Sequence, residues 1–398
     1  MNKSVLNLPM NYNLYLTCPR GLEIECANEL TKLGCENISP DNGGVFLTGN
    51  LRTIYTVNHL SRLGMHLLLK IVQLDCKDEQ SLYDKIYDIN WTKYISYIQT
   101  ISVNVRSRRS WLSNTQFAAL KVKDAVVDRI RAYSGKRPSI DIRSADVPID
   151  IFLDGTTCNV YLNTSGDPLF KRGYREKIHK AALNESLAAG LVKLSKWTHS
   201  EPLFDPMCGS GTLAIEAAMM ALNIPPRGNR RGYAFMKWLN YDSFLWDDVK
   251  LVAETNINNT DKIRIYASDK LIENINMCKE SAMKAGVHKH IHFSVCNIKH
   301  FRPLTERSGF IITNPPYGER IGGEEEELEF LYTTINERFI NYCKGFSIYM
   351  ICTESPFLEF ITTDPSAQIP IRNGKLECNF LHYEIPADEK RNQNVQNR

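Results

Sequence analysis

The chain has 398 residues, is 43% hydrophobic, 10% aromatic and 23% charged, and carries a formal net charge of +3. This ordinary globular composition excludes a disordered or collagen-like protein, and at about 150 residues per domain it predicts two or three domains. No apolar run approaches the about 20 residues that span a bilayer, and the first 20 residues lack the pattern of a secretory signal, so we expect a cytoplasmic protein without a membrane partner.

The eleven cysteines are scattered along the chain, and none forms a Cys-x-x-Cys pair. The spacing of a zinc ribbon is therefore missing, and no metal site is expected. An odd number of cysteines without a secretory signal fits reduced thiols in a cytosol. We interpret most of them as small, buried apolar residues.

The charges are unevenly distributed along the chain. Residues 1–180 hold 24 Lys and Arg against 18 Asp and Glu, whereas residues 181–398 hold 24 against 27. The segment 96–180 alone holds 15 against 8. A basic first half joined to a slightly acidic second half favours a polyanion-binding module attached to something else. The charges alone fit a solvated surface equally well.

The first 65 residues alternate strand and helix patterns. Alternating apolar residues predict strands at 12–18 and 44–47. Apolar residues at helical spacing predict helices at 22–33 and 51–63. This order is compatible with a small ferredoxin-like module.

Residues 66–164 continue with the same small α/β pattern. The last two strands read as a hairpin around Asp154-Gly155, and the second helix is strongly amphipathic. The predicted bounds are strands 66–74, 101–106, 149–153 and 158–162 and helices 80–89 and 115–133.

The segment 165–183 differs from what precedes it. Turn-forming residues at 165–168 are followed by the basic sequence Lys171-Arg172-Gly173-Tyr174-Arg175. We place the domain boundary in this basic linker.

From residue 184 onward, helices alternate with short apolar strands. This alternation predicts an α/β fold with a mostly parallel sheet and helices on both faces, followed by a frayed polar tail. The predicted bounds are helices 184–197, 212–222, 271–285 and 325–342 and strands 202–205, 264–268, 291–295, 310–313, 347–352 and 376–385.

One strand-to-helix turn has the sequence Asp205-Pro206-Met207-Cys208-Gly209-Ser210-Gly211-Thr212. Its two glycines let the backbone approach a ligand, and the helix N-terminus that follows suits an anion. A phosphate loop would need a Gly-Lys-Ser/Thr ending, and a dinucleotide site would need a third glycine, whereas Ala214 stands there. These absences favour an amino-acid carboxylate as the anion, with a purely structural turn as the alternative.

A second loop, Asn314-Pro315-Pro316-Tyr317, follows the apolar strand 310–313. The prolines remove two backbone donors, which leaves the Asn314 side-chain oxygen and the Pro315 carbonyl as acceptors. Two acceptors that hold the hydrogens of a planar amine draw its nitrogen toward a tetrahedral geometry and free the lone pair. Tyr317 offers a ring on which a flipped-out base can stack.

Two further polar residues follow neighbouring strands. Asp269 suits a pair of ribose hydroxyls, although it also fits a helix N-cap. Asn297 suits the amino group of an adenine, although it also fits an ordinary loop position.

Together, Asp205–Thr212, Ser268-Asp269 and Asn314-Pro315-Pro316-Tyr317-Gly318-Glu319-Arg320, in this order and spacing, resemble the motifs of class I S-adenosylmethionine-dependent methyltransferases. More narrowly, they are similar to those of the THUMP-containing RNA guanine-N2 methyltransferases, especially the bacterial 23S rRNA enzyme and its stand-alone relatives. The basic linker and Ala182-Leu183-Asn184 are similar to the interdomain segment of that subfamily. The resemblance covers nearly the whole chain and is most specific in its second half.

The resemblance implies a Rossmann-like catalytic domain preceded by ferredoxin-like and THUMP modules. The implied domains are ferredoxin-like 1–65, THUMP 66–164, linker 165–183, methyltransferase 184–388 and tail 389–398. The cofactor S-adenosylmethionine would be held by Asp205, Pro206, Gly209, Ser210, Gly211, Thr212, Asp269, Asn297 and Asn314. The target base would be held by Asn314, Pro315, Pro316 and Tyr317. The family usually has Asp where this chain has Asn297, which retains an acceptor oxygen.

The expected partner is RNA, with phosphates contacted by a basic face. That face is predicted to consist of Arg106, Arg108, Arg109, Lys121, Lys123, Arg129 and Arg131, with Arg172 and Arg175 from the linker. Trp111 would stack on a base or simply pack in the fold. The expected reaction is direct transfer of a methyl group to a guanine N2 amine, by positioning and desolvation.

Other functions remain open from the sequence. The target is expected to be a guanine of 23S rRNA, with transfer RNA as the alternative RNA. Asn-Pro-Pro-Tyr serves adenine-N6 methylation of DNA equally well, and protein-glutamine methylation has the same planar nitrogen. A ribosome-assembly RNA-binding protein that has lost catalysis is a further alternative. The sequence leaves the oligomeric state open.

Overall fold

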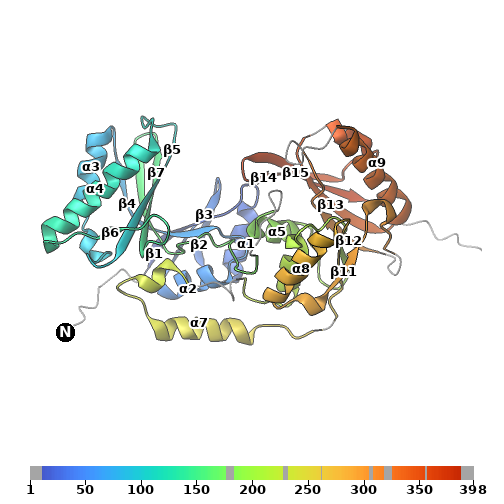
Figure 1. Cartoon of the computed structure of the whole chain (residues 1–398). Helices are drawn as coiled ribbons and strands as arrows, with labels where there is room; N and C mark the ends of the chain where they lie inside the picture. Colours follow the sequence, from blue (N-terminus) through green and yellow to red (C-terminus); the bar gives the residue numbers. More distant parts are fainter. Residues whose placement is uncertain are drawn as a thin grey trace, which may run out of the picture. The chain divides into compact units, whose positions relative to one another are not determined.

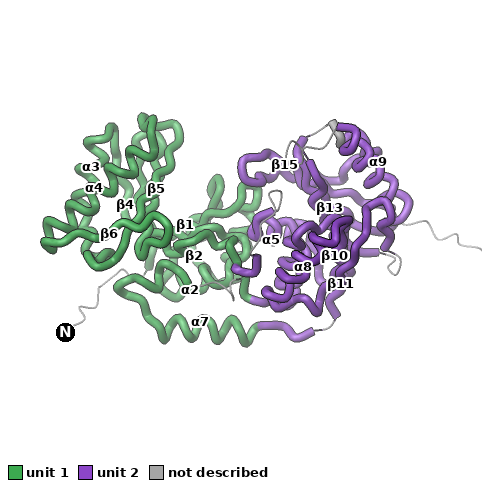
Figure 2. Tube along the Cα trace, in the orientation of Figure 1, with its two compact units in different colours: residues 1–172, 225–256 green, residues 173–224, 257–398 purple. Residues whose placement is uncertain are grey.

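A computed structural model describes residues 11–175, 183–226, 232–260, 262–303, 308–317, 325–354 and 356–386 of the chain. The chain forms two compact units (Figure 2). Unit 1 contains Met1–Arg172 and Pro225–Asn256, and unit 2 contains Gly173–Ile224 and Ile257–Arg398. The change from one unit to the other, between Arg172 and Gly173, falls within the linker segment 165–183.

Unit 1 is built on one eight-stranded sheet with the order β2-β3-β1-β4-β8-β7-β5-β6 (Figure 1). The ferredoxin-like and THUMP segments share this sheet because the long strand β4 pairs with β1 along one edge and with β8 along the other. The strands are β1 Tyr12–Thr17, β2 Glu36–Asp41, β3 Gly44–Gly49, β4 His66–Asp75, β5 Thr100–Arg108, β6 Ser139–Ile140, β7 Val147–Asp154 and β8 Thr157–Asn163.

The helices of unit 1 begin at residues that suit helix starts. Asn50 and Asp78 each form a capping box, and Asn114 accepts from the first turn of the long helix α4. Gly135, in the left-handed conformation, ends α4. The helices are α1 Glu23–Lys32, α2 Leu51–Leu60, α3 Glu79–Asp88, η1 Trp91–Lys93, α4 Thr115–Ser134, η2 Ala234–Lys237 and α7 Ser243–Thr255.

The sequence did not predict α7, and it did not predict that 225–256 pack with the first half of the chain. An aromatic cluster explains this placement: Phe235 stacks on Tyr55 of α2 with ring centroids 4.4 Å apart, and Trp246 meets the same ring edge-on at 5.9 Å. The Tyr55 hydroxyl also accepts a hydrogen bond from the Asp242 backbone at the start of α7. The expected catalytic stretch 184–388 is therefore interrupted by a segment that belongs to unit 1.

Unit 2 is built on a seven-stranded sheet with the order β11-β10-β9-β12-β13-β15-β14. The first five strands in this order are parallel, and β15 pairs antiparallel with both β13 and β14. The mostly parallel α/β fold predicted from the sequence is confirmed. Its strands are β9 Leu203–Asp205, β10 Ile265–Asp269, β11 Ile291–Val295, β12 Gly309–Thr313, β13 Phe346–Cys352, β14 Ala367–Asn373 and β15 Leu376–Glu384. Its helices are α5 Glu185–Leu194, α6 Thr212–Ala221, α8 Ile272–Lys284, η3 His288–His290, η4 Ile298–His300, α9 Glu325–Tyr342 and η6 Pro356–Phe360.

Strand β9 lies at the point where the strand order of this sheet reverses. Its neighbours are β10 on one side and β12 on the other, and all three are parallel. Ligands of open α/β sheets bind beyond the carboxyl ends of the strands at such a point. The loops after β9, β10 and β12 therefore meet where a ligand site is expected.

Within the described ranges, no helix is both long enough and apolar enough to cross a bilayer. The cysteines are all free thiols, and most of them are buried. Among the same described residues, no group of three or more His, Cys, Asp or Glu side chains is arranged to hold a metal ion.

Candidate functional site

A cavity of about 750 Å³ lies in unit 2 at the carboxyl ends of β9, β10 and β12. It brings together three loops that lie far apart in the sequence. Of the residues predicted to hold cofactor or base, those that line it are Asp205, Pro206, Gly209, Ser210, Thr212, Asp269, Asn297, Asn314, Pro315, Pro316 and Tyr317. Gly211 is the one predicted residue that the described lining leaves out.

The two glycines of the first loop have different roles. Gly209 has a φ of +52°, and a Cβ built on it would meet nothing within 4 Å, so this position is open to a ligand. Gly211 has a φ of +81°, and a Cβ there would lie 2.0 Å from the Cys278 sulfur. The prediction that both glycines admit a ligand is therefore corrected: Gly211 is needed for close packing against α8.

Asp269 holds two loops together. One carboxylate oxygen accepts from the Gly209 backbone at 3.0 Å. The other accepts from the Leu271 backbone at 3.0 Å and from the Asn274 side chain at 2.9 Å. A carboxylate has about four acceptor positions, so one remains for a ligand hydroxyl. Asp269 is not the N-cap of α8, because Leu271 occupies that position.

Asp205, at the end of β9, is buried beneath the same loop. Burial raises the pKa of its carboxyl to about 8, and the neighbouring Asp269 charge adds to this increase. Hydrogen bonds from the Met207 backbone and the Thr313 hydroxyl act in the opposite direction. The raised pKa favours the protonated form of this carboxyl at neutral pH.

The second loop leaves an acceptor without a partner. The Asn314 side-chain oxygen is buried and has no hydrogen bond among the described residues, and the same holds for the Ser210 hydroxyl on the first loop. A buried polar atom without a partner is costly and is commonly completed by a ligand or water. Asn314 and Ser210 both line the cavity, where a bound polar ligand can supply the missing partners.

Tyr317 differs from its prediction as an open stacking surface. Its side chain lines the cavity, but the residue is only 5% exposed, and its hydroxyl accepts from the Asn373 side chain at 2.9 Å. Helix α9 also fixes the loop, because the Tyr332 hydroxyl donates to the Pro316 carbonyl at 3.3 Å. The ring is held inside unit 2, so Tyr317 forms a wall and does not present a free face.

Asn297 has the loop role that the sequence gave as the alternative to an adenine contact. Its side-chain oxygen accepts from the Lys299 backbone at 3.1 Å and caps η4. It also lines the cavity. The capping bond directs the oxygen toward the chain, so the amide N–H groups are the part of Asn297 that a ligand can use.

Sequence reasoning missed the wall that α9 contributes. The residues that line the cavity from this helix are Glu326, Glu327, Leu328, Phe330, Leu331 and Thr334. Of these, Glu327, Phe330, Leu331 and Thr334 lie three or four residues apart, which places them on one helix face. Phe330 is 67% exposed, a large apolar side chain at the cavity edge. The 3.6-residue periodicity of this helix was visible, but the sequence gives no sign that this face lies against the two loops.

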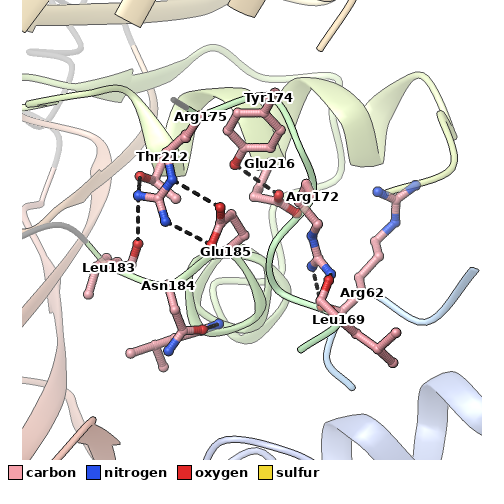
Figure 3. A network of polar contacts seen from close by, with 11 residues as sticks. Arg62, Leu169, Arg172, Tyr174, Arg175, Leu183, Asn184, Glu185, Thr212 and Glu216 are labelled. Atoms are coloured by element: carbon pink, nitrogen blue, oxygen red, sulfur yellow. Dashed lines mark hydrogen bonds and ion pairs between the residues drawn. The ribbon is translucent and has the colours of Figure 1, made fainter. Parts of the chain in front are cut away.

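Two of the predicted RNA contacts are corrected because the residues are buried (Figure 3). Arg172 is 1% exposed and donates to the Leu169 carbonyl at 2.8 Å and to the Arg62 carbonyl. The Arg175 side chain is 5% exposed and forms an ion pair with Glu185 at 2.7 Å. Neither guanidinium is available to a phosphate, so Arg172 and Arg175 are structural residues of the linker.

The remaining predicted cations lie on two faces of the unit 1 sheet, and the prediction of one basic face is corrected. Arg106 and Arg108 are exposed on β5 at alternate positions, while the buried Ile101 and Val105 of the same strand point to the other face, where α4 packs. The cations predicted from α4 are Lys121, Lys123, Arg129 and Arg131.

Several of these cations already have partners. Arg108 and Arg109 both lie near Asp154, and Arg131 pairs with Asp128. Trp111 donates its indole N–H to the Cys76 carbonyl at 2.6 Å, which favours the packing role for this side chain.

Known protein families match the chain in three consecutive parts. A family model described as the RlmL ferredoxin-like domain matches residues 13–68, a THUMP domain matches 76–163, and an RMKL-like methyltransferase domain matches 172–382. These matches cover both units and all three loops of the cavity.

Individual relatives resemble the chain over almost its whole length. A "Ribosomal RNA large subunit methyltransferase K/L" of Shewanella sp. (strain W3-18-1) is 34% identical over 383 residues, which are 95% of this chain and 54% of that protein. The chain thus spans about half the length of such curated relatives. A "Putative RNA methyltransferase slr0064" of Synechocystis sp. is 33% identical over 371 residues, which are 93% of this chain and 96% of that protein.

A solved structure extends the similarity to the fold. It is that of SMU.472, a putative methyltransferase complexed with SAH, at 26% identity and a TM-score of 0.86. The match covers 96% of this chain and 100% of the solved chain.

Proposed function

The chain belongs to the RMKL-like methyltransferase family, and on that premise we propose that it transfers a methyl group from S-adenosylmethionine to the exocyclic N2 amine of a guanine in RNA. The favoured substrate is 23S ribosomal RNA. The ribosomal RNA methyltransferase named among the relatives supports this substrate class. The choice of guanine N2 rests on the motif resemblance in the sequence.

S-adenosylmethionine is the cofactor, as predicted from the sequence. The cavity residues fit it, because Gly209 leaves room for a ligand and the buried Ser210 hydroxyl has no partner in the part of the chain that the structure describes. We assign the methionine part to Asp205, Ser210 and Thr212, the ribose to Asp269, and the adenine to Asn297. When bound, the cofactor supplies an electrophilic methyl group on a sulfonium.

The observation that carries the proposal is the Asn314 oxygen, which has no partner among the described residues. Asn314 lines the same cavity as the glycine loop and precedes two prolines, which have no N–H to satisfy its oxygen. An exocyclic amine has hydrogens to donate and fits this acceptor. Asn314 and the Pro315 carbonyl would hold those hydrogens and direct the nitrogen lone pair toward the methyl group. The chain then contributes positioning and exclusion of water.

RNA binding is assigned to unit 1. We propose the ferredoxin-like and THUMP modules, at 1–65 and 66–164, as the RNA-holding part, followed by the linker 165–183, the catalytic domain 184–388 without its unit 1 segment 225–256, and the tail 389–398. The match to a THUMP domain supports this division. Among the predicted cations, Arg106 is exposed and has no ion pair to another described residue, so it is the first candidate for a phosphate contact.

The alternatives differ in the acceptor molecule. Transfer RNA would be held by the same modules, whereas adenine-N6 methylation of DNA would use the same proline loop on a different base. Protein-glutamine methylation requires no RNA-holding module, and the THUMP match counts against it. The intact Asn-Pro-Pro-Tyr sequence counts against a protein that has lost catalysis.

The test uses the full chain with tritiated S-adenosylmethionine and four separate acceptor pools: ribosomal RNA, transfer RNA, DNA and protein. Labelled RNA is then digested to nucleosides. The expected product is N2-methylguanosine from 23S ribosomal RNA. Label in N2-methylguanosine from transfer RNA would show that transfer RNA, and not 23S ribosomal RNA, is the substrate. Label in N6-methyladenine from DNA would overturn the proposal.

A further inference from the structure

Arg175 and Glu185 form a buried ion pair in unit 2. The guanidinium and carboxylate meet in a fork, with Nε to Oε1 at 2.9 Å and Nη2 to Oε2 at 2.7 Å. The two side chains are 5% and 4% exposed. Removing such a pair from water is costly, and apolar side chains of similar size are often as stable. Stability alone therefore does not explain the arginine, and its third nitrogen, Nη1, indicates a further role.

The remaining nitrogen of Arg175, Nη1, contacts Leu183 and Thr212 (Figure 3). Nη1 donates to the Leu183 carbonyl and to the Thr212 hydroxyl oxygen, each at 3.1 Å. Leu183 and Thr212 both line the cavity. One side chain thus connects two points of the wall that are far apart in the sequence, and Glu185 neutralises its charge.

The preceding residue docks on the same helix. The Tyr174 hydroxyl donates to Glu216 at 3.1 Å, one turn after Thr212 on α6, and both side chains are buried. Tyr174 and Arg175 therefore fix the first turn of α6 from outside the cavity. That turn has no side-chain cap of its own, because its N-cap is Gly211.

In the hydrogen bond between Arg175 and Thr212, the arginine must be the donor. Arginine carries only donors, so the Thr212 oxygen must accept, and its own hydrogen must then point elsewhere. Thr212 is buried and faces the cavity at the N-terminus of α6, where a carboxylate is favoured. The arginine thus orients the threonine hydroxyl as a donor.

We propose that Arg175 is a positioning residue for the cofactor: it fixes the Thr212 hydroxyl as a hydrogen-bond donor to the carboxylate of the methionine part of S-adenosylmethionine. This inference rests on the cofactor assignment in the proposed function, but not on the identity of the methyl acceptor. Because the arginine acts through Thr212, its contribution disappears when the threonine hydroxyl is absent.

The test measures the affinity of S-adenosylhomocysteine for the full chain by titration calorimetry, with the melting temperature of each variant recorded in parallel. The variants are Arg175→Lys, Arg175→Met, Thr212→Val and the double variant Arg175→Met/Thr212→Val. Lys171→Met, an exposed cation four residues earlier, is the matched control. Loss of one charge-assisted or neutral hydrogen bond corresponds to about a tenfold loss of affinity.

We expect Arg175→Lys, Arg175→Met and Thr212→Val each to weaken binding about tenfold. We expect Arg175→Met to cause less than about a twofold further loss in the Thr212→Val background, because the two act through one hydrogen bond. If Arg175→Met fails to fold, Arg175→Lys, which keeps the charge, is combined with Thr212→Val in its place. The control should bind like the original chain.

A purely structural arginine would give a different pattern. It would lower the melting temperature while leaving the affinity of Arg175→Lys within about twofold, or it would weaken binding equally with and without the Thr212 hydroxyl. Either result overturns the inference and leaves the proposed function standing. Failure of the unaltered chain to bind S-adenosylhomocysteine would instead contradict the cofactor assignment itself.

Discussion

The two loops that line the cavity differ in how their polar groups are used. In the glycine loop, the Gly209 backbone is bound by Asp269, which itself accepts three hydrogen bonds within unit 2. In the proline loop, the Asn314 oxygen is buried without a partner among the described residues, and the glycine loop has one such atom as well, the Ser210 hydroxyl. The comparison indicates that groups with internal partners shape the cavity, whereas groups without them await a ligand.

The largest effect is expected where an unpartnered group is removed. Asn314→Ala deletes the acceptor proposed to hold the amine and should lower kcat by about a hundredfold to a thousandfold, as does the loss of one oriented catalytic group in other enzymes. The affinity for S-adenosylhomocysteine should change by less than about fivefold, since the methionine part binds to the other loop. Single-turnover methyl transfer and calorimetry measure the two quantities.

Asn13→Ala, an exposed asparagine on β1, provides the control and should behave like the original chain. Methyl transfer by Asn314→Ala at the original rate would show that the open acceptor has no catalytic role and would remove the contrast between the loops.

The two glycines sharpen the contrast within one loop. Gly211→Ala places a Cβ 2.0 Å from the Cys278 sulfur at a positive φ and should lower the free energy of unfolding by about 2–4 kcal/mol. Gly209→Ala meets no neighbouring atom, so it should cost only about 1 kcal/mol for its φ while weakening cofactor binding. Urea unfolding and calorimetry separate the two effects.

Cys278→Ala in the Gly211→Ala background removes the clashing sulfur and should recover the part of the loss that comes from overpacking. No recovery would mean that the backbone conformation alone requires glycine at position 211.

The parts of this site that the sequence predicts are those fixed by strand ends. Asp205, Asp269 and Asn314 each follow an apolar strand directly, and parallel strands bring their carboxyl ends to one edge of the sheet. Their meeting in one cavity therefore follows from local pattern and topology.

Burial of the remaining residues depends on partners that no local pattern identifies. Tyr317 is held by Asn373, 56 residues later, and Phe235 packs on Tyr55, 180 residues earlier. The sequence of the basic linker predicts a surface segment because its arginines are evident there. The backbone carbonyls and Glu185 that bind these arginines cannot be identified from the sequence. Which of the predicted arginines are exposed depends on how the whole chain packs, and local sequence does not show this packing.

A smaller effect is expected from the pH dependence of cofactor binding. The pKa of Asp205 lies at about 8 instead of 3.8 because the carboxyl is buried. An ammonium group of the methionine part favours the ionised form, so binding below pH 8 releases a proton, and affinity should increase from pH 6 to 8 by at most about tenfold per pH unit. Calorimetry at several pH values, in buffers of different ionisation enthalpy, measures both.

The effect of Asp205 on stability has the opposite pH dependence to its effect on cofactor affinity. Between 3.8 and about 8 the folded state holds a proton on Asp205 that the unfolded chain has lost, so this group makes the protein less stable as the pH rises through that range. Asp205→Asn removes the titration, and its affinity for S-adenosylhomocysteine should not vary over pH 6 to 8. An affinity of the original chain that is equal at both ends of this range would contradict a contact between Asp205 and the ammonium group.

The smallest effect extends the same contrast to the arginines of unit 1. Arg106 is exposed and has no hydrogen bond or ion pair to another described residue, whereas the guanidinium of Arg172 is buried on two backbone carbonyls. Arg106→Gln should weaken RNA binding a few-fold and reduce the slope of log affinity against log salt by about 0.9, the value for one lost phosphate contact on a duplex. Filter binding at several salt concentrations measures this slope.

Arg172→Gln is the informative counterpart, because it removes the same charge from a position that RNA does not reach. It should leave the salt slope unchanged and lower the melting temperature, since the Arg62 and Leu169 carbonyls would lose a charged donor. Equal changes in slope for the two variants would show that exposure does not decide which arginines meet phosphates. A slope that changes only for Arg106→Gln would indicate that polar groups without internal partners contact the ligand in unit 1, as proposed for the Asn314 oxygen in unit 2.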